Sequence, residues 1–101
     1  MLFPLLAVAA APVPVQSVTL TLKDHRFQPD KVAVRTGEPI DVVLTDKDGT
    51  PEEFDSEDLG VEEVVHPGQT IRFRIGPLKP GSYSFMGEHH ADTAAGVIVS
   101  R

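Results

Sequence analysis

Apolar and polar residues alternate along much of the chain, with the period of two that is typical of a half-buried β-strand. Residues 70–76 show it most clearly, because Ile71, Phe73 and Ile75 alternate with two arginines. Residues 18–23 alternate valine and leucine with threonine and lysine in the same way. We expect the apolar members to face a core and the polar members to face solvent. Further short strands are predicted within residues 32–34, 40–46, 61–68, 82–87 and 96–100.

Glycine and proline separate these runs, and no segment repeats its apolar residues with a sustained helical period. The β-branched run at 40–46 predicts a central strand. The expected fold class is all-β, a Greek-key β-sandwich of about seven or eight strands. Residues 50–63 (TPEEFDSEDLGVEE) break the rhythm and predict a long loop with one helical turn around Ser56–Leu59.

The composition limits the chemistry available to this chain. Its 101 residues suffice for one domain, and 41% hydrophobic residues fit a small globular core. It has no cysteine, which excludes disulfides, thiolate catalysis and iron–sulfur clusters. The formal net charge of −6 disfavours a nucleic-acid partner and favours cations. No phosphate-binding loop, dinucleotide fingerprint, zinc-protease motif or serine-nucleophile elbow is present.

The first segment, MLFPLLAVAAAPVPV, has no charged side chain. Its apolar run ends in small residues, which is typical of a secretory signal peptide with cleavage near Ala9–Ala11. We therefore expect residues 1–15 to be a signal peptide and leader, and residues 16–101 to be the domain. Export to the periplasm and a mature chain without a transmembrane segment follow, because the run is too short to span a membrane. A truncated start or a first edge strand are the alternatives.

The segment GSYSFMGEHHADTAAGVIV (81–99) contains a set of metal-binding residue types. His89 and His90 are adjacent in a turn between two predicted strands, and imidazole suits copper, iron, zinc and nickel. The thioether of Met86 favours copper, especially Cu(I), although Met86 could equally fill space in a core. Glu88 and Asp92 add oxygen donors close to the histidines. If Tyr83 and Phe85 face the core, strand alternation directs Met86 outward or toward the end of the sandwich.

Other candidate residues lie earlier in the chain. His25 follows the first predicted strand and is either a ligand or a hydrogen-bonded residue at a strand edge. His66 precedes Pro-Gly in a turn and is interpreted as a surface residue. Glu52 and Glu53 could join a metal site if the acidic segment lies at the same end of the sandwich. Eight carboxylates occur between Asp48 and Glu63, which is either a solvated surface or a region that attracts cations.

Two segments resemble the cupredoxins. FQPDKVAVRTGEPIDVVLTD is similar to the early strands of that family, and GSYSFMGEHHADTAAGVIV is similar to its closing hairpin and ligand loop. The resemblance covers roughly Val15 to Ser100 and implies a cupredoxin-like sandwich. Blue-copper members of the family bind copper with a mid-chain His, a Cys, a second His and a Met.

Only one of these four ligands is present in this sequence. The mid-chain position after a proline is Glu52, since Pro51 precedes it, and the Cys position is Gly87. The second His is His90, and the Met position is Ala94. The resemblance therefore implies that a blue copper–thiolate centre does not form here.

A narrower resemblance involves KDHRFQP, TPEEFDSEDL, GPLKPG and GEHHADTAAGVIV. These segments are similar to cupredoxin-like proteins of bacterial periplasmic iron uptake, including the N-terminal domain of EfeO-type proteins. Here His89 stands where that group usually has an aromatic residue. The resemblance implies a copper-binding protein that works with a membrane iron permease and other periplasmic iron-uptake components. The residues that match the group are His25, Glu52, Glu53, Glu88 and His90.

We thus expect copper as the cofactor, with iron as the substrate or as an alternative bound ion. A ferroxidase-like activity is one function consistent with this; a non-redox periplasmic copper or iron carrier is the second, and a domain whose site has decayed is the third. Glu53 and Asp92 are expected to guide cations toward the site. The expected metal ligands are His90, Glu52, Glu88, Met86, His89 and His25.

Overall fold

Two β-sheets form the domain in the computed structural model, which describes residues 1–5 and 11–101. One sheet has the strand order β2-β1-β4-β7 and the other has the order β3-β9-β8-β5-β6. The strands and the single 3₁₀ helix of the described residues are β1 (Gln16–Lys23), β2 (Arg26–Gln28), β3 (Lys31–Val34), β4 (Ile40–Asp46), β5 (Glu52–Ser56), β6 (Val61–Val65), β7 (Thr70–Ile75), β8 (Gly81–Gly87), η1 (Glu88–His90) and β9 (Ala95–Ser100).

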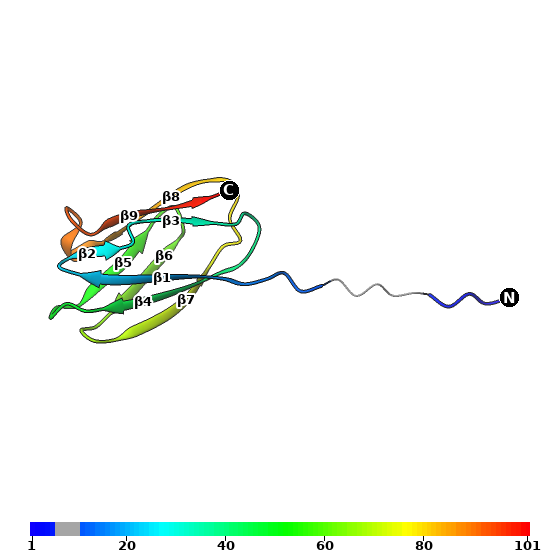
Figure 1. Ribbon diagram of the computed structural model, residues 1–101, viewed down its shortest axis with the longest axis horizontal. Helices are drawn as coiled ribbons and strands as arrows, with labels where there is room; N and C mark the ends of the chain where they lie inside the picture. The colour runs from blue at the N-terminus through cyan, green and yellow to red at the C-terminus, as the bar shows by residue number, and fades with distance from the viewer. Residues whose placement is uncertain (6–10) are drawn as a thin grey trace.

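The all-β Greek-key sandwich is confirmed, with nine strands among the described residues instead of seven or eight. Most connections cross from one sheet to the other, and the parallel pairs β1–β4 and β3–β9 join strands that are not consecutive in the chain. The β1–β2 turn, the β4–β5 connection and η1 therefore meet at one end of the sandwich, on the left in Figure 1. We call this end the histidine end, because it carries His25, His89 and His90.

The core lies between the sheets, where the predicted alternation holds. In β1 and β4 every second residue is buried, and the partly buried Ile71 and Phe73 of β7 alternate with exposed arginines. Aromatic rings fill the centre: Phe54 stacks on Phe85 with 4.9 Å between ring centroids and lies 5.8 Å from Phe27. Burying these apolar surfaces is the main driving force for the fold.

The prediction of a long loop over residues 50–63 is wrong. The segment forms β5, a turn at residues 57–60 and the start of β6, with no helical turn. The strand alternates like the others, but two of its inward positions hold Glu52 and Ser56, so that only Phe54 is apolar. Because the buried residue at the first position is a glutamate, β5 lacks the alternation of apolar and polar residues by which the other strands are predicted.

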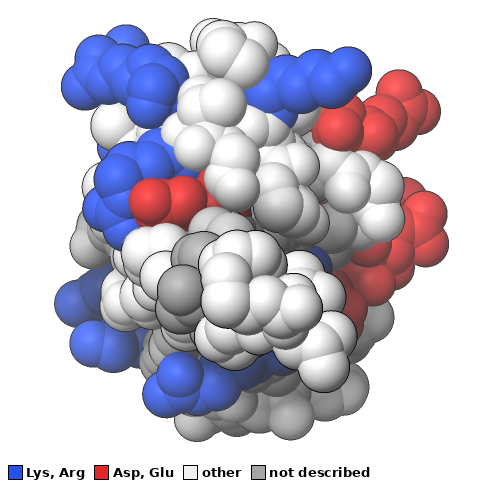
Figure 2. All heavy atoms as spheres, turned by 90° about the vertical axis from the view of Figure 1, so that its right-hand side faces the viewer, with Lys and Arg blue, Asp and Glu red and all other residues white. Residues whose placement is uncertain are grey.

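The opposite end of the sandwich, facing the viewer in Figure 2, gathers Lys and Arg side chains. Its loops and the C-terminus carry Arg35, Lys79 and Arg101, all exposed. The described residues 1–5 and 11–15 form neither helix nor strand; the expected signal peptide includes residues 6–10, which lie outside the described residues. Within the described chain no helix has the length and apolar character needed to cross a membrane.

Truncating the central aromatic ring should destabilise the sandwich. Phe54→Ala removes a side chain that is 0% exposed and packs on three other rings, so we expect a loss of about 3–5 kcal/mol in the free energy of unfolding. Chemical denaturation measures it. Val64→Ala is the control, because Val64 is 49% exposed and its change should stay within about 0.5 kcal/mol. Equal losses from the two variants would contradict this description of the core.

Candidate metal centre

His25 lies in the two-residue turn between β1 and β2, in an unusual backbone conformation. Asp24 and His25 both have positive φ, 53° and 56°, although neither is glycine. The carboxylate of Asp48 accepts hydrogen bonds from both backbone N–H groups, at 2.7 and 2.9 Å. On the other side, the hydroxyl of Thr93 donates to the His25 carbonyl at 2.7 Å. The backbone of His25 is therefore held from two distant segments of the chain.

Asp48 is itself held by the fully buried Asp46 at the end of β4, whose carboxylate accepts the Asp48 backbone N–H at 2.8 Å. Burial raises the pKa of Asp46 above its ordinary value. The hydrogen bond from the Asp48 backbone and the nearby His25 lower the pKa, but by less than burial raises it. The Nδ1 atom of His25 lies 3.4 Å from Asp48 Oδ2 but makes no hydrogen bond among the described residues. A buried ring nitrogen next to a carboxylate is thus left without a partner.

Glu52, the first residue of β5, binds the η1 turn through both of its carboxylate oxygens. Oε2 lies 2.8 Å from Nδ1 of His90. Oε1 accepts the backbone N–H groups of His89 at 2.8 Å and of Glu53 at 2.9 Å. The side chain is 2% exposed. Burial alone would raise the pKa of Glu52, but these three hydrogen bonds outweigh it, and the pKa lies below its ordinary value of 4.5.

The partners of the two histidines determine which ring nitrogen carries the proton. A carboxylate and a carbonyl only accept hydrogen bonds, so the ring nitrogen beside each must donate. Nδ1 of His90 faces Glu52, and Nδ1 of His89 lies 3.0 Å from the carbonyl oxygen of Pro51. That carbonyl, followed by nearby carboxylates, raises the pKa of His89. In both neutral rings the lone pair is therefore on Nε2, where a metal ion could bind.

The rings of His25 and His90 stack, with 3.6 Å between centroids and 12° between planes. A metal ion binds in the plane of an imidazole ring, so two stacked rings cannot both direct a lone pair at one ion. His90 is fixed by Glu52, whereas the side chain of His25 is 42% exposed and its ring makes no hydrogen bond among the described residues. His25 is the ring that would have to turn for both to bind one ion.

Gly87 ends β8 where the resemblance to cupredoxins places a cysteine. A Cβ atom there would lie 2.7 Å from Cδ of Glu52, 2.8 Å from its Oε2 and 2.9 Å from Cβ of Ala94. Such distances are shorter than van der Waals contact. The carboxylate of Glu52 therefore occupies the space that a side chain at position 87 would need.

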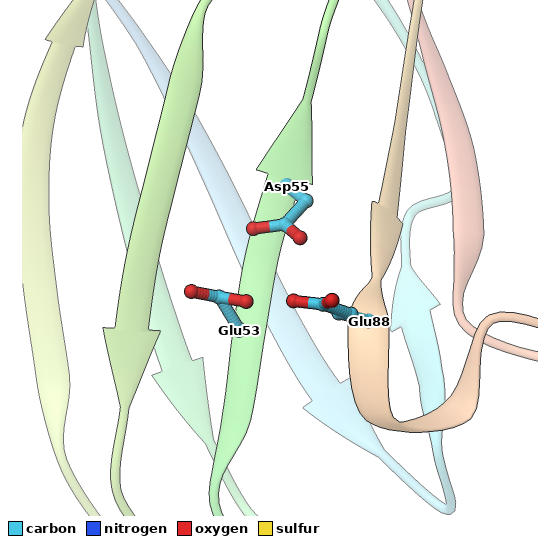
Figure 3. A group of neighbouring side chains, drawn as sticks. All are labelled: Glu53, Asp55 and Glu88. Atoms are coloured by element: carbon cyan, nitrogen blue, oxygen red, sulfur yellow. The ribbon is translucent and has the colours of Figure 1, made fainter.

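A second group of donors lies on the outer face of β5. Figure 3 shows Glu53 and Asp55 on β5, with Glu88 turned toward them from the start of η1, directly after β8. One ligand atom from each lies within 4.8 Å of the other two. Within the described parts of the chain, this is the one such trio of His, Asp or Glu residues. We call it the outer trio.

The three outer carboxyl groups shift one another's pKa values. The hydrogen bond with Glu88 raises the pKa of Glu53 to about 7, and burial, followed by Glu88, raises the pKa of Asp55 to about 6. The pKa of Glu88 is lowered, because Glu53 and Asp55 donate to it. No Lys or Arg occurs between residues 48 and 71 to compensate this negative charge.

The structure thus divides the predicted ligands into two groups. The histidine end brings together His25, His89, His90 and Glu52. Met86 points outward as expected, is 41% exposed and lies on the same side of the sheet as Glu88 and Asp55. Glu53 belongs to the outer trio, and Asp92 is exposed in the loop after η1.

Sequence reasoning did not single out Asp48, Thr93 or Asp55. The first two act through hydrogen bonds to residues 23–68 positions away, which no local pattern reports. Asp55 could have been found by alternation, because it shares the outer face with Glu53 once residues 52–56 are recognised as a strand.

The geometry defines a Greek-key β-sandwich that gathers histidines at one end. The chain matches the cupredoxin-like domain family over residues 1–100, and it belongs to that family. The uncharacterized protein RP394 of Rickettsia prowazekii is 41% identical over 85 residues, covering 84% of this chain and 68% of the relative.

Solved structures show the same fold at low sequence identity. The metal-binding domain of the Cu(I)-exporting ATPase CopA of Streptococcus pneumoniae, determined with Cu(I), has a TM-score of 0.74 at 15% identity and covers 92% of each chain. The blue copper protein auracyanin A of Chloroflexus aurantiacus has a TM-score of 0.76 at 9% identity, over 87% of this chain and 100% of that one. The fold of this chain is therefore one that copper-binding proteins use.

Removing the charge of Glu88 should weaken the pH dependence of stability. Raised pKa values in the folded state mean that the contribution of Glu53 and Asp55 to stability is present at low pH and lost as the pH rises through about 6 to 7. In Glu88→Gln the loss between about pH 5 and about pH 8 should be smaller than in the wild type. Urea denaturation at the two pH values measures it.

Asp92→Asn is the matched control, since it removes an exposed carboxylate that follows η1. It should retain the wild-type loss. If Glu88→Gln also retains the full loss, the three carboxyl groups do not interact as described.

Proposed function

We propose that this protein binds copper at the histidine end of the sandwich without a thiolate, and assists ferrous-iron oxidation and uptake with a membrane iron permease in the periplasm. The observation that carries the copper proposal is the hydrogen bond between Glu52 and His90. It leaves Nε2 of a fixed imidazole free at the end of the fold where His25 and His89 also lie. Imidazole nitrogens suit copper, and no cysteine is present to form a copper–thiolate bond.

The residues present fit copper in their chemistry. His90 and His89 would hold the ion, joined by His25 if its ring turned out of the stack with His90; Nδ1 of His25 makes no hydrogen bond in the described structure that would oppose this turn. Bound copper would supply a one-electron acceptor. Glu52 would orient His90, and Asp48 would hold the turn that presents His25. Met86 lies on the outer face, so the proposed site contains nitrogen donors without sulfur.

The role in iron oxidation is supported by the acidic surface of β5 and β6. Carboxylates attract Fe²⁺ and stabilise Fe³⁺ more than Fe²⁺, because the more highly charged ion gains more from anionic oxygens. Loss of one electron from Fe²⁺ is therefore favoured beside such groups. Glu53 and Glu88 of the outer trio would guide the ion.

A non-redox copper or iron carrier is the alternative function. It is favoured by the position of the two donor groups on opposite faces of β5, with Glu52 inward and Glu53 outward. This arrangement does not place nitrogen and carboxylate ligands around one shared site. Export to the periplasm and the permease as partner remain part of the proposal.

Removal of His90 should abolish most of the copper affinity. Mutation of a residue that only hydrogen-bonds to a metal ligand commonly lowers metal affinity about 10–100-fold. His90→Ala removes the ligand itself, so we expect the Cu²⁺ affinity to fall by at least about 100-fold. Titration calorimetry with Cu²⁺ measures it. His66→Ala is the control, because His66 lies in the β6–β7 turn and should change the affinity little. Equal losses from both variants would overturn the assignment.

Copper-loaded protein should oxidise Fe²⁺ in air faster than the same amount of free copper. The formation of Fe³⁺ is followed optically, and Glu53→Gln should slow it if the acidic surface guides the ion. A rate equal to that of free copper would leave the carrier as the function. Failure to bind copper tighter than about 10 μM would instead support a domain whose site has decayed.

A further inference from the structure

The two oxygens of the Glu52 carboxylate have different partners, and this difference assigns a role to the residue. Oε1 faces two backbone donors, the N–H groups of His89 and Glu53, at 2.8 and 2.9 Å. Oε2 faces Nδ1 of His90 at 2.8 Å. At 2% exposure the side chain has almost no access to solvent that could replace these partners. Three of the roughly four lone-pair positions of the carboxylate are thus occupied, and burial restricts access to the remaining one on Oε2, beside the ring of His90.

We propose that Glu52 is a positioning residue and not a metal ligand. It holds His90 in the tautomer with the proton on Nδ1, and so keeps the lone pair of Nε2 available to a metal ion. Carboxylates that accept the second ring N–H of a metal-binding histidine act in this way in other metal sites. The inference rests on the proposed function for the identity of His90 as a ligand, but the tautomer itself is a property of the protein without metal.

Glu52 also determines which donors can be present at this end of the fold. Its carboxylate lies where a side chain at position 87 would begin, with only 2.7 Å between Cδ and the Cβ that such a residue would have. A carboxylate in this orientation and a cysteine at position 87 exclude each other. Together with Ala94, whose Cβ would lie 2.9 Å from the same atom, Glu52 leaves no room for a thiolate beside the imidazole nitrogens.

Replacing one oxygen of Glu52 by nitrogen should reverse the tautomer of His90. In Glu52→Gln the two backbone N–H groups hold the amide oxygen on their side, because an NH₂ group there would face two donors. The NH₂ group then faces Nδ1 of His90, which must accept a hydrogen bond. The proton of the neutral ring moves to Nε2, where it blocks metal binding.

The tautomers are read from ¹⁵N chemical shifts and long-range ¹H–¹⁵N couplings of the histidine rings. Spectra are recorded on metal-free protein at about pH 8, where an unperturbed imidazole is neutral. We expect the Nδ1–H form of His90 in the wild type and the Nε2–H form in Glu52→Gln, together with an approximately 10–100-fold loss of Cu²⁺ affinity. Glu53→Gln is the matched control, since Glu53 is the next residue and lies on the outer face. It should keep the wild-type tautomer.

Two results would overturn the inference. One is a wild-type His90 with its proton on Nε2, which needs no variant and so does not depend on whether Glu52→Gln folds. The other is a folded Glu52→Gln protein in which His90 keeps the Nδ1–H form. A wild type that has the expected tautomer but binds no copper would refute the proposed function while leaving the role of Glu52 intact.

Discussion

The buried carboxylate of Glu52 is the interaction on which the histidine end depends. It brings the start of β5 and the η1 turn together across more than thirty positions of sequence through two hydrogen bonds, to His89 and His90, and a third, from the backbone N–H of Glu53, completes its set of partners. A buried charge without such partners would be strongly unfavourable, so the carboxylate and its donors require one another. The same atoms fill the space beside Gly87, which links the absence of a side chain there to the presence of the acid on a neighbouring strand.

The alternation of β5 explains why the donors form two groups. Successive side chains of a strand point to opposite faces, so Glu52 reaches His90 while Glu53 and Asp55 reach Glu88. Nitrogen donors gather at the end of the sandwich and oxygen donors on its outer surface. Softer and harder metal ions prefer these two sets respectively. The inward and outward residues of a single strand thus belong to two separate groups of candidate metal ligands.

The sequence predicts the fold well because period-two alternation reports burial directly. It fails for β5, where the residue with the most important buried contacts is an acid and not a hydrophobic residue. The resemblance to cupredoxins draws attention to Gly87 as the position of the missing thiolate, and the structure shows that a side chain there would collide with Glu52. Strand alternation predicts the outward position of Met86, but no local pattern could indicate that Glu52 fills that space or that Asp48 supports the turn of His25. Each of these depends on contacts between distant segments, which exist only once the two sheets have packed.

The proposed copper site consists of imidazole without thiolate or thioether. X-ray absorption at the copper edge of the loaded protein tests it most directly, because it distinguishes nitrogen and oxygen neighbours from sulfur. We expect nitrogen and oxygen atoms to be bound directly to the copper, with additional scattering from the more distant atoms of the imidazole rings. The only sulfur atoms of the chain belong to Met1 and Met86. A sulfur shell, or a first shell without imidazole, would contradict the placement of the site at His90.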